Sequence, residues 1–228
     1  MNCKKDQIVL NNIILPKWGV TKHIEEGWNV LSNEEKVIVN NKVNKLFNQE
    51  NIVNIKTNQI FYVHLFAFFA QVEVLAIQIP LKFMNDFEGE IYNQLRRQLI
   101  DEVVHGIIFT KVAYELSLPY SHPIPGFKDA EIMCDSIRSI EDRRLALVAL
   151  NLIAEGWIEE VFVHMVEWKM ANKIFESILE DEERHVSEAE LYSKIGNVDK
   201  DELLNCIRSM EEKLINAVCS PTVARSVF

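Results

Sequence analysis

Apolar residues along this chain recur at helical spacing, and capping and break signals divide them into segments. Residues Ser32-Asn33-Glu34-Glu35 form a capping-box pattern, so we expect a helix from there to about Phe47. The polar, Asn-rich stretch 48–58 predicts a loop. Residues 1–31 contain one proline and two glycines among mixed apolar residues, which favours an irregular arm with room for a short helix.

Residues 60–79 are the most apolar run of the chain, and we expect Pro80 to end it. The run approaches the length of a membrane span, but four polar residues, Glu73 among them, interrupt it and no second such run follows. A helix that is apolar on all sides is more simply the buried centre of a bundle. We therefore expect no membrane-spanning segment.

Further helices are expected at about 85–118, 129–139, 141–168, 172–195 and 199–218, with a proline-broken connection at 119–127. Because glycine and proline are few and alternating strand runs are missing, the sequence predicts an all-α fold. We expect one domain over 1–228: an N-terminal arm and helix (1–57), a four-helix bundle (58–195), and a C-terminal helix and tail (196–228).

The chain is acidic, and this charge disfavours negatively charged partners. The formal net charge is −10, the pI is about 5.2, and no long basic block is present. Nucleic acids and anionic membrane surfaces are therefore not expected as partners. The four cysteines form no Cys-x-x-Cys pair, and the N-terminus lacks the pattern of a secretion signal. These features predict a cytoplasmic protein with idle thiols.

Two segments share one arrangement, Asp101-Glu102-Val103-Val104-His105 and Asp181-Glu182-Glu183-Arg184-His185. A Glu and a His three residues apart lie on one helical face, so each segment can present a carboxylate and an imidazole together. In the second segment only Glu182 has this spacing from His185. The repetition makes the pattern more informative than either copy.

Glu73 and Glu155 lie inside apolar helices, where an unpaired carboxylate costs several kcal/mol. Each could face solvent through a narrow polar stripe, pair with a cation such as Arg96 or Arg97, or bind a metal. Glu102 follows Glu73 by 29 residues, and Glu182 follows Glu155 by 27. In an antiparallel helix pair with its turn midway, such residues meet at one height, so two hairpins can gather all six side chains.

The series Glu73, Glu102-x-x-His105, Glu155, Glu182-x-x-His185 resembles the ferritin-like superfamily over about residues 58–195. Its four-helix bundles hold two iron or manganese ions with one Glu from each of two helices and a Glu-x-x-His from each of the others. The resemblance implies a ferritin-like bundle with additional N- and C-terminal helices, and it makes these six residues the metal ligands. Four carboxylates and two divalent cations would leave the buried cluster near neutral.

Asp-Glu-x-Arg-His at 181–185 is similar to the motif of oxygen-activating di-iron members. That resemblance implies that Asp101 and Asp181 accept a hydrogen bond from a ligand histidine and fix its orientation. The alternative for both is an exposed charge. Arg184 is expected to form an ion pair with a nearby carboxylate. Glu159 shares the face of Glu155 and is expected beside the metals or paired with a cation, with an extra ligand as the alternative.

Several aromatic residues fall near the ligands at helical spacing. Most aromatics at such positions belong to the core, but a few could line an apolar pocket over the metals. The candidates for the pocket are Tyr62, Phe66, Phe69, Phe109 and Phe162.

The resemblance implies an O2-dependent di-iron oxidase or oxygenase, with manganese or a mixed Mn/Fe pair as alternatives, acting on a small apolar organic substrate. The catalytic residues would be Glu73, Glu102, Glu155 and Glu182, which hold and bridge the metals. Electrons would come from an external donor, a ferredoxin or a flavin reductase, because no Cys cluster for an iron–sulfur centre is present. The alternative is a bacterioferritin- or rubrerythrin-like protein that binds and oxidises iron without an organic substrate. A monomer or homodimer would favour the enzyme over a storage cage.

Overall fold

The computed structural model of this chain describes residues 7–49, 59–118, 124, 126–167, 171–194, 199, 201–205, 207–209 and 212. The N-terminal elements are β1 (Gln7–Leu10), β2 (Ile13–Pro16), α1 (Thr21–Val30) and α2 (Asn33–Gln49). They are followed by α3 (Gln59–Phe83), the 3₁₀ turn η3 (Met84–Asp86), α4 (Gly89–Ser117) and α5 (Lys128–Arg138). The last elements are α6 (Arg143–Val148), the π-helix η5 (Ala149–Glu155), α7 (Gly156–Glu167) and α8 (Asn172–Lys194). The predicted all-α class is confirmed, with one small hairpin added.

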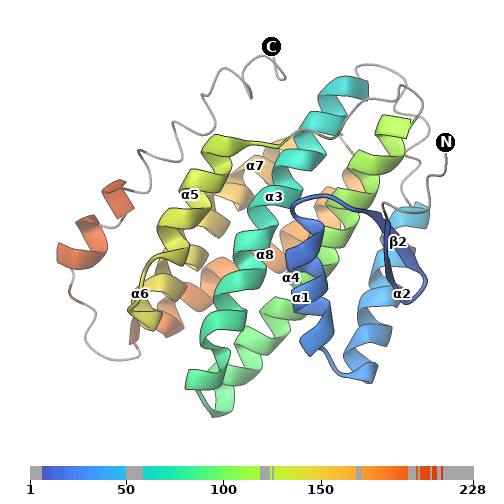
Figure 1. Cartoon of the computed structure of the whole chain (residues 1–228). Coiled ribbons are helices and arrows are strands. Elements are labelled where there is room, and N and C mark those ends of the chain that lie inside the picture. Colours follow the sequence, from blue (N-terminus) through green and yellow to red (C-terminus); the bar gives the residue numbers. More distant parts are fainter. Residues whose placement is uncertain are drawn as a thin grey trace.

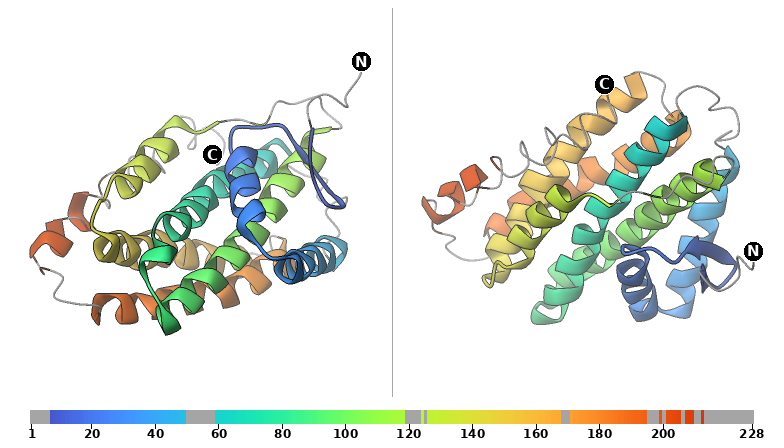
Figure 2. Two further views of the ribbon diagram at one scale, coloured as in Figure 1. Left: turned by 60° about the horizontal axis from the view of Figure 1, so that its bottom comes forward. Right: turned by 45° about the horizontal axis from the view of Figure 1, so that its top comes forward.

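Two long helical hairpins form the centre of the molecule (Figure 1). In the first, α3 packs along α4 and the turn η3 joins them. In the second, the continuous run α6–η5–α7 packs along α8. Helix α2 lies against α4 and α8, whereas α1 and α5 both pack on α3 (Figure 2). The turn expected midway between Glu73 and Glu102 is therefore present at η3, and α7 ends at Glu167 before α8 begins at Asn172.

Pro80 does not end its helix, contrary to the expectation from the sequence, because α3 continues to Phe83. An internal proline removes one backbone hydrogen bond and crowds the preceding turn. Here the neighbours Ile79 and Phe83 are buried at 0% and 5% exposure, so tertiary packing holds the last turn in place. Propensity alone therefore placed the end of this helix one turn too early.

The N-terminal arm is more ordered than predicted. Strands β1 and β2 pair antiparallel with Leu10 opposite Ile13, around a two-residue Asn11-Asn12 turn in which Asn11 has a φ of 57°. Asparagine tolerates this left-handed conformation, which two-residue hairpin turns require. The capping box before α2 is confirmed: Ser32 N–H donates to Glu35 at 2.6 Å, and Glu35 N–H donates to the Ser32 hydroxyl at 3.2 Å.

Helix α3 occupies the middle of the core. Within the described residues, the stretch Ile60–Asp86 is long and apolar enough to cross a membrane, but 67% of its most apolar window is buried by the rest of the chain. This burial is typical of the core helix of a soluble protein. The predicted C-terminal helix is described only in part, at residues 201–205 and 207–209, which are helical.

Candidate metal centre

Four helical segments deliver carboxylates and imidazoles to one depth of the bundle. Glu73 comes from α3, Glu102 and His105 from α4, Glu155 from η5, and Glu182 and His185 from α8. All six side chains are buried, with 0–3% exposure. Their possible ligand atoms fall into two groups, and within each group all of these atoms lie within 4.8 Å of one another. We call Glu73, Glu102, His105 and Glu182 half-site A, and Glu102, Glu155, Glu182 and His185 half-site B.

Glu102 and Glu182 belong to both half-sites and lie between the two imidazoles. The Glu102 carboxylate approaches His105 Nδ1 at 3.2 Å with one oxygen and His185 Nδ1 at 2.9 Å with the other. The Glu182 carboxylate does the same at 3.1 and 3.5 Å. Glu73 lies 3.7 Å from His105 Nδ1. Each half-site thus gathers three carboxylates and one imidazole, a donor set that could hold a cation.

The polar atoms that face this centre lack the hydrogen bonds that buried groups normally make. Glu73 Oε1, both oxygens of Glu102 and Glu182, and Nδ1 of both histidines have no partner in hydrogen-bonding geometry within the described part of the chain, although the carboxylates and imidazoles lie close together. Buried polar atoms without a partner are rare in folded proteins and need an explanation. Oxygen-rich ligation with two imidazoles suits iron or manganese better than zinc, which prefers a smaller tetrahedral set. The cluster is therefore a candidate metal centre.

The pKa values of the buried acids and imidazoles in this cluster depart from their ordinary values in both directions. Burial raises the pKa of Glu73 and of Glu155 well above the usual range, and the neighbouring carboxylates Glu102 and Glu182 raise both further. Burial opposes the charged imidazoles, but Glu102 and other carboxylates outweigh it and raise the pKa of His185 to about 10 and that of His105 well above its ordinary value. Burial opposes ionisation of Glu182 too, yet Glu155 and the imidazoles lower its pKa. Protons thus compete with metal for these atoms.

A π-helix brings Glu155 to the centre. Segment η5 covers Ala149–Glu155, and Glu155 is its last residue. Asn151, one turn before Glu155, donates to the Leu147 carbonyl at 2.9 Å and accepts from the Gln98 amide at 3.0 Å. Gln98 lies one turn before Glu102 on α4, so this buried amide pair ties the two ligand-bearing segments together. Single-turn π-bulges often mark functional sites, but the sequence contained no signal from which we predicted this one.

Each of the two aspartates lies near the histidine of the other motif, not near the histidine of its own. Asp181 Oδ2 lies 3.2 Å from His105 Nε2, in hydrogen-bonding geometry. Asp101 Oδ2 lies 4.0 Å from His185 Nε2, which is an electrostatic contact without a hydrogen bond. Instead, Arg184 Nη2 lies 2.9 Å from His185 Nε2. Both aspartates are largely buried, so the alternative of a plain exposed charge does not hold.

Arg184 and Lys42 complete a ring of two cations and two carboxylates. Arg184 donates to Asp101 at 2.5 Å and to Asp181 at 3.2 Å, as the expected ion pair but with two partners. Lys42, from α2, donates to Asp101 at 3.0 Å and to Asp181 at 2.5 Å. Burial opposes the ammonium of Lys42, but the two aspartates outweigh it and raise its pKa. Sequence reasoning missed Lys42, although it is a lysine between the apolar positions Val39 and Val43.

The structure does not support the solvent-facing alternative for the two lone glutamates, nor their pairing with Arg96. Neither Glu73 nor Glu155 faces solvent, and Arg96 pairs with Glu35 at 2.5 Å instead of with either of them. Glu159 is only half-buried and is not among the atoms of either half-site. Burial and the nearby acids Glu183 and Glu160 raise the pKa of Glu159.

The aromatic residues expected near the ligands pack against one another. Phe69 lies 5.4 Å from Phe109 and 5.0 Å from Phe162, measured between ring centroids. Phe175 of α8 joins them at 5.1 Å from Phe162, and sequence reasoning did not include it. Phe66 also contacts this cluster, and Tyr62 stacks on Phe66 at 6.4 Å. These four phenylalanines and Phe175 are at most 1% exposed, and we call them the phenylalanine cluster.

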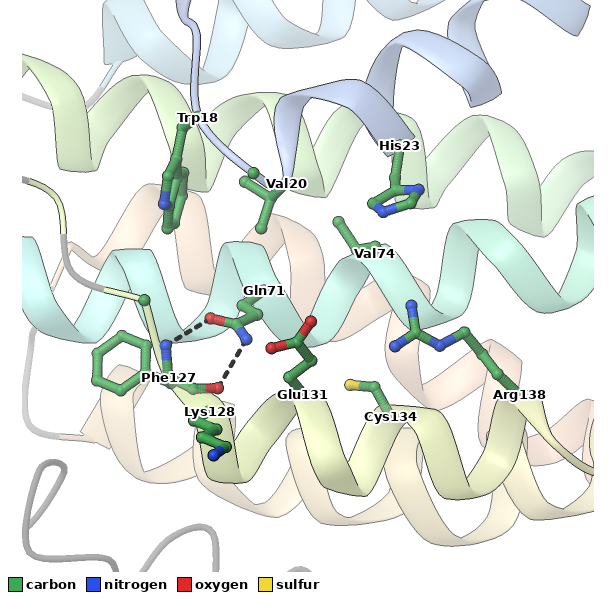
Figure 3. A pocket seen from close by; sticks show the side chains of 12 residues that line it. Trp18, Val20, His23, Gln71, Val74, Phe127, Lys128, Glu131, Cys134 and Arg138 are labelled. Atoms are coloured by element: carbon green, nitrogen blue, oxygen red, sulfur yellow. Dashed lines mark hydrogen bonds between the residues drawn. The ribbon is translucent and has the colours of Figure 1, made fainter.

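A separate hollow of about 470 Å³ lies on another side of α3, where α1 and α5 flank it (Figure 3). Its polar lining is largely engaged: Gln71 exchanges two hydrogen bonds with the Phe127 backbone, and Arg138 donates to Gln78. Burial raises the pKa of the Cys134 thiol there to about 12, in agreement with the expected idle thiol. No ligand of half-site A or B and none of the predicted pocket aromatics lines this hollow.

Comparisons of this chain with protein-family models, curated proteins and solved structures find no match.

Proposed function

We propose that this protein is a di-iron oxidase or oxygenase that activates O2 and oxidises a small organic substrate. One observation carries the proposal: Glu102 and Glu182 each lie between the two imidazole Nδ1 atoms, inside a centre that is closed to water by its burial. The ligand set resembles that of ferritin-like di-iron proteins, in which two metals are held by carboxylates and two histidines. This resemblance supports the proposed reaction with O2.

The metal pair, when bound, supplies the redox chemistry, and the protein supplies geometry and a dry site. Glu73 and Glu155 would each hold one metal from one end, and Glu102 and Glu182 would hold both. His105 would bind through Nδ1, because its Nε2 is engaged with Asp181. His185 would use the same atom, because its Nδ1 faces the Glu102 and Glu182 carboxylates. Electrons would come from an external donor such as a ferredoxin or flavin reductase, as the sequence predicted.

The test begins with metal content and anaerobic loading with Fe(II). Exposure of the loaded protein to O2, followed by near-UV and visible absorbance, should show an oxo-bridged chromophore that is absent from Glu102→Gln. Wild-type protein that binds two Fe(II) ions but gives the same spectrum before and after O2 would contradict the proposed activity.

A second function, iron oxidation without an organic substrate, is favoured by the phenylalanine cluster. The rings that could have lined a substrate pocket pack against one another as core residues, with neighbouring centroids as close as 5.0 Å. Repeated additions of Fe(II) in air separate the two functions. An enzyme acting on an organic substrate should bind and oxidise about two irons per chain, whereas an iron-storing protein should continue to take up iron and should assemble into a large shell.

A further inference from the structure

Helix α2 stands outside the four ligand-bearing segments and packs on both α4 and α8 (Figure 2). Its inner stripe is apolar, with Val39, Val43 and Leu46 at 0–2% exposure. Lys42 lies on the edge of this stripe with its side chain only 26% exposed. A lysine that is mostly withdrawn from water needs a partner for its charge.

The contacts of Lys42 lead to the candidate metal centre in two steps. Its ammonium donates to Asp181 Oδ2 at 2.5 Å, and the same oxygen faces His105 Nε2 at 3.2 Å. The other contact, to Asp101 Oδ1 at 3.0 Å, ends at a carboxylate that forms no hydrogen bond with His185. The path through Asp181 is therefore the stronger of the two.

We propose that Lys42 is a positioning residue for half-site A, acting through Asp181 on the orientation and ligand strength of His105. The inference rests on the proposed metal centre but not on its reactivity with O2. A carboxylate that accepts a hydrogen bond from an imidazole N–H fixes the orientation of the ring and raises its basicity as a ligand. The ammonium shares that carboxylate oxygen, so it holds Asp181 in place against His105, and its removal should leave the imidazole less well oriented toward the metal.

The proposal differs from a purely structural role, in which Lys42 only anchors α2 to the bundle. If Lys42 were only an anchor, its mutation would change the free energy of unfolding and would leave the affinity of both half-sites for metal unchanged. A positioning residue changes the metal at half-site A more than the metal at half-site B, because Arg184 faces His185 on that side.

The test uses the full chain and Co(II), which reports on each metal by absorbance and magnetic circular dichroism without requiring O2. Lys42→Met removes the charge and keeps the length of the side chain. We expect the metal-free variant to keep its helical content, one of its two Co(II) ions to bind roughly 10- to 100-fold more weakly, and the spectrum of one ion to shift. Lys42→Arg should restore both, because it retains the donor charge.

Lys45→Met, on the exposed side of the same helix, is the matched control and should behave as wild type. If Lys42→Met does not fold, Lys42→Gln takes its place. Wild-type Co(II) affinities and spectra in the uncharged variant would overturn the proposal, as would a Lys42→Arg variant that loses affinity equally. Wild-type protein that binds no Co(II) would overturn it together with the metal centre, whereas normal Co(II) binding without O2 chemistry would contradict only the proposed function.

Discussion

Half-sites A and B begin from the same sequence motif but are held by different means. In half-site A, Glu73 lies on the regular helix α3, and His105 is oriented by a hydrogen-bonded carboxylate at 3.2 Å. In half-site B, Glu155 ends a π-helix, and His185 has Arg184 at 2.9 Å and its aspartate at 4.0 Å. A repeated motif therefore does not imply two equivalent metals. We expect half-site A to bind the first metal more tightly, because its imidazole is already oriented.

The largest effect is expected where the two half-sites coincide. Glu182→Gln removes a carboxylate that both share, so both metals should be lost or weakened by at least about 100-fold. The matched control is Glu183→Gln, one residue on but exposed, which should bind two metals as wild type does. Metal analysis after dialysis measures both. Retention of two metals by Glu182→Gln would refute its bridging position.

Removal of a terminal ligand should separate the half-sites. Glu73→Gln should lose the metal at A and keep a weaker one at B, while Glu155→Gln should do the reverse, because each variant keeps both shared carboxylates. Calorimetric titration with Mn(II) measures the number of bound ions. Loss of both ions in both variants would show that the two sites fill only as a pair.

The response to pH should have opposite signs in metal-free and loaded protein. The pKa of His185 is raised to about 10 in the folded protein, so its stabilisation is complete below the unfolded value near 6.5 and is lost as pH rises toward 10. Metal-free protein should thus lose stability as the pH rises over this window. Metal-loaded protein should become more stable over the same window. The pKa values of both imidazoles, Glu73 and Glu155 are raised, so metal binding displaces protons and is favoured at higher pH. Thermal melts with and without Mn(II) at pH 6.5 to 9 measure this, and parallel curves would contradict it.

The smallest effect is expected from the amide pair behind half-site B. Asn151→Leu breaks the bond from Gln98 and should lower the free energy of unfolding by about 1–3 kcal/mol, because it leaves a buried amide unsatisfied. It should weaken the metal at B more than the metal at A, since Asn151 precedes Glu155 by one turn. Denaturant titration and metal titration measure the two effects. An equal loss at both half-sites would show that η5 is not specific to B.

The sequence predicted the helical class, the two hairpins and the six side chains that the structure gathers, because all three depend on local spacing. Glu73 and Glu102 meet because their spacing allows a turn midway between them, and the structure has that turn at η3. Pro80 misled the prediction because packing in the core overrides a local break. The hairpin β1–β2 was missed because four-residue strands carry almost no periodic signal.

The surroundings of the candidate site were harder to predict than its ligands. Lys42 reaches Asp181 from 139 residues away along the chain, and no local spacing encodes such a contact. The crossing of each aspartate to the other motif depends on how α4 and α8 sit against each other. The π-helix at Glu155 depends on a buried amide pair between two helices. These features arise from tertiary packing, so one sequence without its fold cannot reveal them.

The central claim is that Glu102 and Glu182 bridge two metals. Mössbauer spectroscopy of the protein loaded with ⁵⁷Fe(II) and then exposed to O2 tests it most directly. The account predicts two irons per chain, two resolved iron environments and a spin-coupled diamagnetic pair, lost in Glu182→Gln and kept in Glu183→Gln. One iron per chain, or two irons that show no magnetic coupling, would contradict it.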